Sequence, residues 1–177
     1  KGDKDQSDIQ NNSLIDVNKS LSNTKNRNVK KMIKIIEMKE YNIFQFICRE
    51  DNYGVIITDK ETGLTLSIDT PDASAVDSQL QKNNLQLSHL FITHKHYDHI
   101  DGIEFLKKKY NCTVIGPDSE KDDIPFLDKT VIGEEYIDFS GSPVKVIETP
   151  GHTLGHVVYF FERENILFAG DTIFLMG

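Results

Sequence analysis

Short apolar runs, many with alternating polar positions, dominate the chain from residue 41 onward. We predict strands over 41–48, 53–59, 64–69, 88–93, 113–117, 143–148, 156–161 and 165–171. The Asp-Asn pair at 51–52 and the Thr-Gly pair at 62–63 separate the first three, because these residue types favour turns.

Two segments show helical spacing instead. One covers roughly 73–84 and follows Pro71 and Asp72, residues typical of a helix start. The other covers 102–110 and places Ile103 and Leu106 on one side. Strands with helices inserted between them predict an α/β or α+β protein in which helices cover sheets.

The composition limits the classes of protein that fit. The 177 residues suffice for one domain with a hydrophobic core, and no apolar run approaches the roughly 20 residues of a membrane span. The net charge of −8 argues against non-specific binding to nucleic acid. Cys48 and Cys112 are too few and too far apart for a disulfide framework or a thiolate zinc site. We therefore expect a reducing, cytoplasmic location.

The first 31 residues differ from the rest. They hold seven Lys/Arg and four Asp, so the acidic excess lies in 32–177. They contain few apolar residues, and we expect 1–31 to be disordered or an extension, with 32–177 as the folded domain. A basic stretch without acidic residues, 19–34, also resembles an organelle-targeting segment. It lacks a clear amphipathic period, which favours an upstream extension.

The segment THKHYDHIDG, residues 93–102, carries half of the six histidines. In an extended chain, positions two apart point the same way, so His94, His96 and Asp98 would face one site. His99 would then point elsewhere, and ligands on two sides can serve two metal ions. Imidazole and carboxylate without thiolate suit zinc, iron or manganese.

Two further segments offer partners for this cluster. TPGHTLGH places His152 in a turn rich in glycine and proline, and Asp171 follows an apolar strand in FAGDT. Each has a plainer interpretation. His152 could be an ordinary turn residue, and the Asp171 side chain could cap the turn that follows it. Asp171 could also bridge two cations with its two oxygens. We expect His156 to support the turn without binding metal, and His89 to lie at the surface or at a strand end.

THKHYDH, TPGHTLGH and GDTIF, in this order, resemble the metallo-β-lactamase superfamily, and more narrowly its glyoxalase II (hydroxyacylglutathione hydrolase) family. The resemblance covers roughly 41–177. It implies an αββα sandwich with two divalent metal ions, and zinc is the expected metal. It implies that the first metal binds His94, His96 and His152, that the second binds Asp98 and His99, and that Asp171 bridges them.

The implied reaction is hydrolysis of the thioester S-D-lactoylglutathione to D-lactate and glutathione, in methylglyoxal detoxification. A hydroxide held between the metals would attack the carbonyl, with Asp98 and Asp171 as the catalytic carboxylates. The expected partner is this small glutathione thioester, with no nucleic acid and no membrane, and the expected state is a monomer.

The pattern departs from the family after Asp171. The family has a further metal-binding histidine downstream, and a C-terminal helical domain whose basic and tyrosine residues hold glutathione. The sequence stops at Gly177, so we expect the N-terminal portion of an enzyme, with an incomplete second sheet, an unpaired sheet edge and weak or no activity by itself. Asp101 stands where the family commonly has a small residue.

Other functions remain open at this point. A persulfide dioxygenase of the same superfamily would hold one iron with two histidines and an aspartate, although HTLGH and GDTIF favour the hydrolase. A nuclease fits the acidic chain poorly, and a true β-lactamase usually lacks the histidine directly after the aspartate. An inactive fragment that only binds metal is the non-enzymatic alternative.

Overall fold

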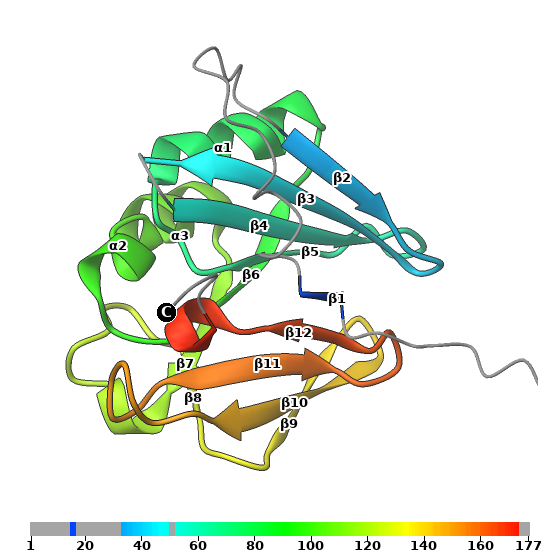
Figure 1. The fold of residues 1–177 in the computed structure, drawn as a ribbon. Helices are drawn as coiled ribbons and strands as arrows, with labels where there is room; N and C mark the ends of the chain where they lie inside the picture. Colours follow the sequence, from blue (N-terminus) through cyan, green and yellow to red (C-terminus); the bar gives the residue numbers. More distant parts are fainter. Residues whose placement is uncertain (1–14, 17–32, 50–51, 174–177) are drawn as a thin grey trace, which may run out of the picture.

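Two sheets packed face to face organise the protein in a computed structural model that describes residues 15–16, 33–49 and 52–173 (Figure 1). Among these residues the larger sheet has seven strands in the order β2-β3-β4-β5-β6-β7-β8, and the smaller has five in the order β1-β12-β11-β10-β9. The strands of the larger sheet are β2 (Ile33–Glu37), β3 (Tyr41–Cys48), β4 (Asn52–Asp59), β5 (Thr65–Ile68), β6 (Leu87–Phe91), β7 (Thr113–Pro117) and β8 (Lys129–Val131). Those of the smaller sheet are β1 (Ile15–Asp16), β9 (Tyr136–Phe139), β10 (Ser142–Glu148), β11 (Val157–Phe161) and β12 (Ile166–Phe168).

The larger sheet changes direction at β5. Strands β2 to β5 pair antiparallel, whereas β5 to β8 pair parallel. Parallel neighbours need crossover connections. Helix α1 (Ala73–Lys82) connects β5 to β6, and α2 (Tyr97–Ile100) with α3 (Ile103–Tyr110) connects β6 to β7. The carboxyl ends of β5, β6 and β7 therefore lie along one edge, where ligand sites of such sheets usually form.

Hydrophobic side chains fill two layers. Between the sheets, inward-facing residues of both pack together, among them Tyr41, Phe91, Phe139 and Tyr159, all at most 1% exposed. On the other face of the larger sheet, α1 and α3 contribute Val76, Leu80, Ile103 and Leu106 to a second cluster. The described residues thus form a helix–sheet–sheet arrangement, and the predicted packing of helices on a sheet is confirmed.

Local sequence explains the helix boundaries. Asp72 accepts hydrogen bonds from the main-chain N–H groups of Ser74 and Ala75 and so caps α1, as its place after Pro71 predicts. Asn111 ends α3 in the left-handed conformation. No helix among the described residues is long and apolar enough to cross a membrane.

Two expectations about the chain ends meet the structure only in part. Most of 1–31 lies outside the described residues, but Ile15–Asp16 forms β1, which pairs in parallel with Ile166 and Leu167 of β12. This pairing is not what a wholly disordered 1–31 implies. It also means that the outer edge of β12, expected to be unpaired, has a partner strand along these two residues.

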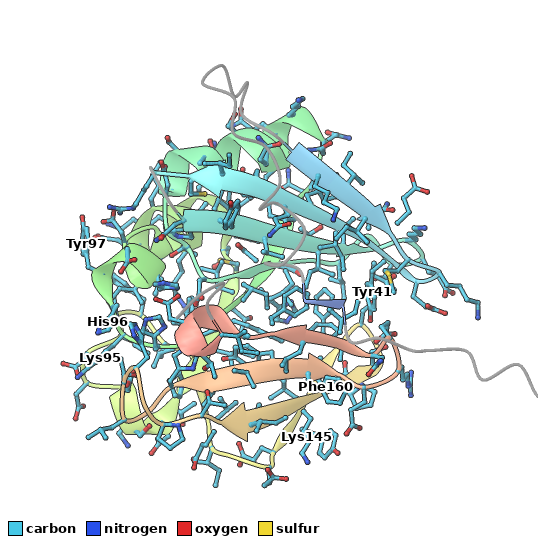
Figure 2. The ribbon with its side chains drawn as sticks, in the orientation of Figure 1. Tyr41, Lys95, His96, Tyr97, Lys145 and Phe160 are labelled. Carbon is cyan, nitrogen blue, oxygen red and sulfur yellow. The ribbon has the colours of Figure 1, made fainter. Side chains whose placement is uncertain are left out.

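The two sheets are joined next to the edge that carries the histidines. The main-chain N–H of Val157 donates to the carbonyl of Thr93 at 3.0 Å, and the buried Tyr159 hydroxyl donates to the carbonyl of Ile92 at 2.7 Å. Figure 2 shows His96 at this end of the sandwich, with Lys95 and Tyr97 toward the outside. The short segment after β6 is therefore fixed by both sheets.

Candidate metal centre

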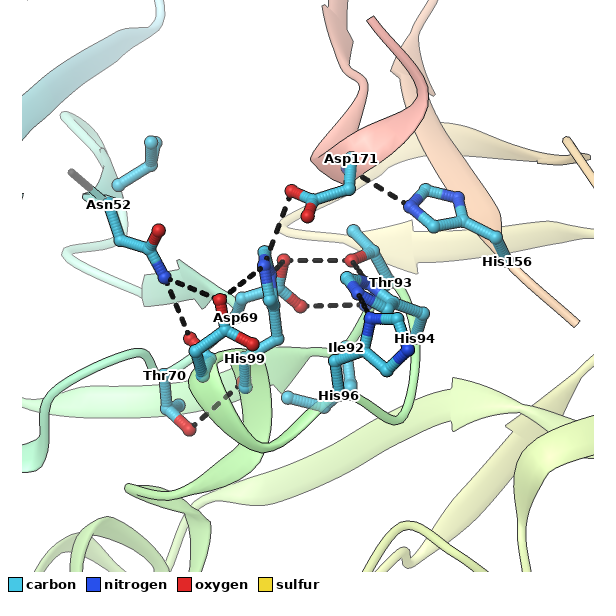
Figure 3. Close-up of polar contacts among 12 residues, drawn as sticks. Asn52, Asp69, Thr70, Ile92, Thr93, His94, His96, His99, His156 and Asp171 are labelled. Atoms are coloured by element: carbon cyan, nitrogen blue, oxygen red, sulfur yellow. Dashed lines mark hydrogen bonds and ion pairs between the residues drawn. The ribbon is translucent and has the colours of Figure 1, made fainter. Parts of the chain in front are cut away.

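Side chains that follow four strands meet at one edge of the two sheets. Asp69 directly follows β5, and His94 lies three residues after β6. His152 lies in the turn after β10, and Asp171 lies three residues after β12, in the short 3-10 helix η3 (Gly170–Thr172). The two sheets thus supply different parts of the same site (Figure 3).

Asp69 determines which ring nitrogen of His94 carries the proton. One Asp69 oxygen accepts the main-chain N–H of Thr93 at 2.7 Å, and the other accepts the Thr93 hydroxyl at 2.8 Å. Since that hydroxyl uses its only proton on Asp69, its oxygen accepts from His94 Nδ1, 2.9 Å away. His94 therefore holds its proton on Nδ1 and presents the lone pair of Nε2.

Two further imidazole nitrogens lie close to His94 Nε2, so that three nitrogens form one group. His94 Nε2 lies 3.1 Å from His96 Nδ1, which lies 2.8 Å from His152 Nε2. His94 is fully buried, while His96 and His152 are partly open to solvent. Four-coordinate zinc with Zn–N bonds of about 2 Å holds its nitrogen ligands roughly 3.3 Å apart, so the spacing of this group fits a metal ion.

A second group forms around His99 on α2. Its Nδ1 donates to Asp69 at 2.9 Å, so its Nε2 is the nitrogen left for a ligand. That Nε2 lies 3.3 Å from Asp171 Oδ1. With His94, these two residues form a second set of ligand atoms close enough to hold one ion.

Asp171 lies between the two groups. Its Oδ1 faces His99, and its Oδ2 lies 3.3 Å from His152 Nε2 of the first group. Each carboxylate oxygen therefore points to a different set of imidazoles. A carboxylate that bridges two cations would need this arrangement of its oxygens.

Asp98 lies at the rim of the second group. Its Oδ2 is 3.7 Å from His99 Nε2, and its side chain is partly exposed. The amide of Asn52, at the start of β4, donates to Asp98 Oδ2 at 2.9 Å and to the Asp98 carbonyl at 3.3 Å. Burial raises the pKa of Asp98, but the Asn52 hydrogen bond and nearby His99 outweigh it, so the pKa is lowered.

His156 supports the turn, as predicted. The main-chain N–H of Asp171 donates to its Nε2 at 3.1 Å, which uses the lone pair that a metal would need. Its Nδ1 lies 3.0 Å from the hydroxyl of Thr149. Gly170 lies against this ring with a left-handed φ of 48°, and a Cβ there would lie 2.7 Å from the Thr93 hydroxyl. Only glycine fits without strain.

The charges around the two groups differ. Burial lowers the pKa of His94 to about 4, so this ring is neutral near pH 7. Burial also opposes charge on His99, but Asp69 and Asp171 outweigh it and raise its pKa to about 10. Three carboxylates near one imidazole favour a positive charge, which a proton or a divalent cation can supply.

The structure corrects parts of the sequence-based geometry. The extended conformation expected through Asp98 ends at His96, because α2 begins at Tyr97. His99 is not directed away from His94, since the centres of the two imidazole rings are 4.2 Å apart. His89 is not at a strand end, because it is the middle residue of β6, and its half-buried ring packs edge-on against Phe139 of the opposite sheet.

All six predicted metal ligands lie at this edge, namely His94, His96, Asp98, His99, His152 and Asp171. Asp98 alone falls outside the two compact sets. Sequence reasoning missed Asp69 and Asn52. Asp69 carried a usable signal, because it follows an apolar run in the sequence as Asp171 does.

Comparisons with known proteins identify the family of this chain. The family model described as "Metallo-beta-lactamase superfamily" matches residues 61–176. A protein of Bartonella henselae named hydroxyacylglutathione hydrolase is 45% identical over 76% of this chain and 53% of its own length. One of Brucella ovis with the same name is 47% identical over 76% of this chain and 52% of its own length. The chain thus spans about half the length of these curated relatives.

Solved structures share the architecture. The crystal structure of ETHE1 from Myxococcus xanthus matches with a TM-score of 0.62 and 25% sequence identity. The match covers 81% of this chain and 59% of that protein.

Proposed function

Because this chain belongs to the metallo-β-lactamase superfamily, we propose that it carries the metal centre of a hydrolase that cleaves a glutathione thioester. The proposed substrate is S-D-lactoylglutathione, and the products are D-lactate and glutathione. This reaction would place the protein in methylglyoxal detoxification.

The observation that carries the proposal is the position of Asp171 between two ligand sets. Its oxygens lie 3.3 Å from His152 Nε2 and 3.3 Å from His99 Nε2. A centre for a single ion needs only one of these contacts. Two adjacent sets that share a carboxylate are expected when two cations act on one water molecule and one carbonyl group.

The chain's own residues have distinct roles in this proposal. His94, His96 and His152 would hold one ion, and His99 with Asp171 and Asp98 would hold the other. Two divalent ions bound there would activate water as a nucleophile and polarise the thioester carbonyl. Asp98, open to solvent on one side and held by Asn52 on the other, would orient the attacking water. The thiolate leaves readily, so little help from a general acid is needed.

The relatives support the substrate class. Proteins named hydroxyacylglutathione hydrolase share 45–47% identity with 76% of this chain. We propose zinc as the metal, because the donor atoms are imidazole nitrogens and carboxylate oxygens. Iron and manganese accept the same ligands. The cytoplasmic location and the monomeric state stay predictions.

The test is to measure metal per chain by elemental analysis together with S-D-lactoylglutathione hydrolysis, followed by the loss of thioester absorbance. The proposal predicts two metals and turnover in a chain extended to the full length of its curated relatives, with turnover lost in a His94→Ala variant. Glu104→Gln is a matched control, because Glu104 is exposed on α3 and pairs with the exposed Lys108.

Other outcomes would favour the alternatives. One iron per chain with oxygen uptake on glutathione persulfide, and no thioesterase activity, would establish the dioxygenase. Stoichiometric metal with neither activity would leave a metal-binding fragment. Two ligand sets, one that includes Asp171 and one whose His152 lies 3.3 Å from it, favour the hydrolase over the one-iron enzyme.

A further inference from the structure

A buried carboxylate outside the ligand sets connects the two loops that carry the three-histidine group, His94, His96 and His152. Glu120 ends η2 (Asp118–Glu120), the short 3-10 helix that follows β7, and is only 4% exposed. Asp69 and Glu120 thus follow β5 and β7, on either side of the histidine segment that follows β6.

Each oxygen of Glu120 accepts a main-chain N–H from a different loop. Oε2 accepts the N–H of Lys95 at 2.7 Å, and Lys95 stands between His94 and His96. Oε1 accepts the N–H of Gly155 at 3.0 Å, in the turn between His152 and His156. One rigid group therefore fixes the distance between two ligand-bearing segments that come from different sheets.

The close approach of this carboxylate explains the second glycine in TPGHTLGH, Gly155. A Cβ at Gly155 would lie 2.5 Å from Glu120 Cγ and 2.2 Å from the hydroxyl oxygen of Ser119. Such distances are too short for any side chain to fit without movement of the turn. The absence of a side chain at 155 thus lets Glu120 reach the main chain.

The nearby ion pair cannot replace this contact. Lys95 Nζ lies 2.7 Å from Asp123, but both side chains are open to solvent. Exposed pairs of this kind contribute little to positioning, because water and salt screen them. Hydrogen bonds from main-chain N–H groups to a buried carboxylate are stronger and hold a defined geometry.

We propose that Glu120 is a positioning residue that holds the His152 turn against the His94–His96 segment and so sets the affinity of the three-histidine group for its metal. The inference rests on the proposed metal centre but not on the proposed substrate. Groups that orient metal ligands typically change metal affinity about 10- to 100-fold when they are removed. Both main-chain contacts of Glu120 lie in the loops of the first group, whereas His99, Asp171 and Asp98 would hold the second ion, so the affinity for that ion is not expected to change.

The experiment titrates the metal-free chain with Zn²⁺ in competition with a chromophoric chelator. Glu120→Ala should weaken binding at the three-histidine group by about 10- to 100-fold. The same substitution in a His152→Ala background reports on the second group, where the affinity should stay the same. Asp122→Asn, an exposed carboxylate in the turn after η2, is the matched control and should bind as the parent chain does.

The outcomes separate this inference from the proposed function. Equal first-ion affinity in Glu120→Ala and the parent chain, with intact circular dichroism, overturns the role of Glu120 and leaves the metal centre standing. If Glu120→Ala does not fold, Glu120→Gln decides, because its amide NH₂ must face one of the two N–H groups. Equal affinity in that variant also overturns the inference. No Zn²⁺ binding by the parent chain would overturn both proposals.

Discussion

Replacing one oxygen of Asp69 by nitrogen should reverse the proton positions on two histidines. In Asp69→Asn, the amide oxygen must keep the main-chain N–H of Thr93, because that donor cannot change its role. The amide NH₂ then faces the Thr93 hydroxyl and His99 Nδ1, which both donate to Asp69 in the parent chain. Each of these groups has to become an acceptor.

The consequence for His94 follows through the hydroxyl. If the Thr93 hydroxyl accepts from the new amide, its own proton turns to His94 Nδ1, and the His94 proton moves to Nε2. Nε2 is the atom that faces His96 and His152. To bind a metal, the ring must return to the original tautomer and leave a buried N–H facing the hydroxyl proton. A buried donor without an acceptor costs about 1–3 kcal/mol, which corresponds to roughly 5- to 150-fold in affinity.

The assay is the first Zn²⁺ dissociation constant at pH 7, measured by chelator competition. His94 is already neutral there, since burial lowers its pKa to about 4, and proton competition at this ring does not complicate the comparison. Thr93→Val removes the same hydroxyl and should cause a similar loss. An unchanged first dissociation constant in folded Asp69→Asn would refute the reasoning.

Asp59→Asn provides the matched control. Asp59 also ends a strand and is 8% exposed, and its Oδ1 accepts hydrogen bonds from Glu61 and Thr62. It therefore tests the loss of a buried charge away from the histidines. Its metal affinity should equal that of the parent chain, whatever happens to its stability.

Three further results are expected. Gly170→Ala should lower the free energy of unfolding in urea by about 1–3 kcal/mol, because overpacking adds to left-handed strain. Gly141→Ala, equally left-handed but with open space, should cost less, and equal losses would contradict this. The metal-free chain should be most stable near pH 6.5. His94, with its lowered pKa, destabilises the fold as pH falls toward about 4, and His99 loses its contribution as pH rises toward about 10. Each of these two histidines should contribute a slope of at most about 1.4 kcal/mol per pH unit in urea unfolding, and a curve without this maximum would exclude the two shifts. Asn52→Ala removes the amide that holds the carboxylate on α2, and chelator competition should show the second Zn²⁺ bound about 10-fold more weakly with the first unchanged; equal losses at both ions would argue against a local effect.

Alternating apolar residues allowed most of the strands to be predicted, because burial on one face leaves a period that is visible in the sequence. The predicted runs 41–48 and 113–117 coincide with β3 and β7. The short strands β1, β2, β8 and β9 were missed, because two to five residues carry little period and β8 and β9 are largely exposed. The helix α2 has four residues, too few for a helical period, so the histidine segment was expected to stay extended.

The candidate ligands were found because histidine is rare and three occur together. The groups that orient them were missed for the opposite reason. Asp69 precedes Thr70 and Pro71 and so looks like an ordinary turn residue, while Glu120 lies within the charged run DSEKDD. What distinguishes both is burial and a partner distant in sequence. Such contacts come from the packing of β5, β6 and β7 side by side, which no local pattern records.

Each ligand set takes members from both sheets, His94 from one and His152 or Asp171 from the other. Free energy of metal binding is therefore also free energy that holds the sheets together. With free metal 100-fold above its dissociation constant, one site adds about 2.7 kcal/mol to stability. A cell short of metal would then hold a more easily opened sandwich, and resistance to proteolysis would report its metal supply.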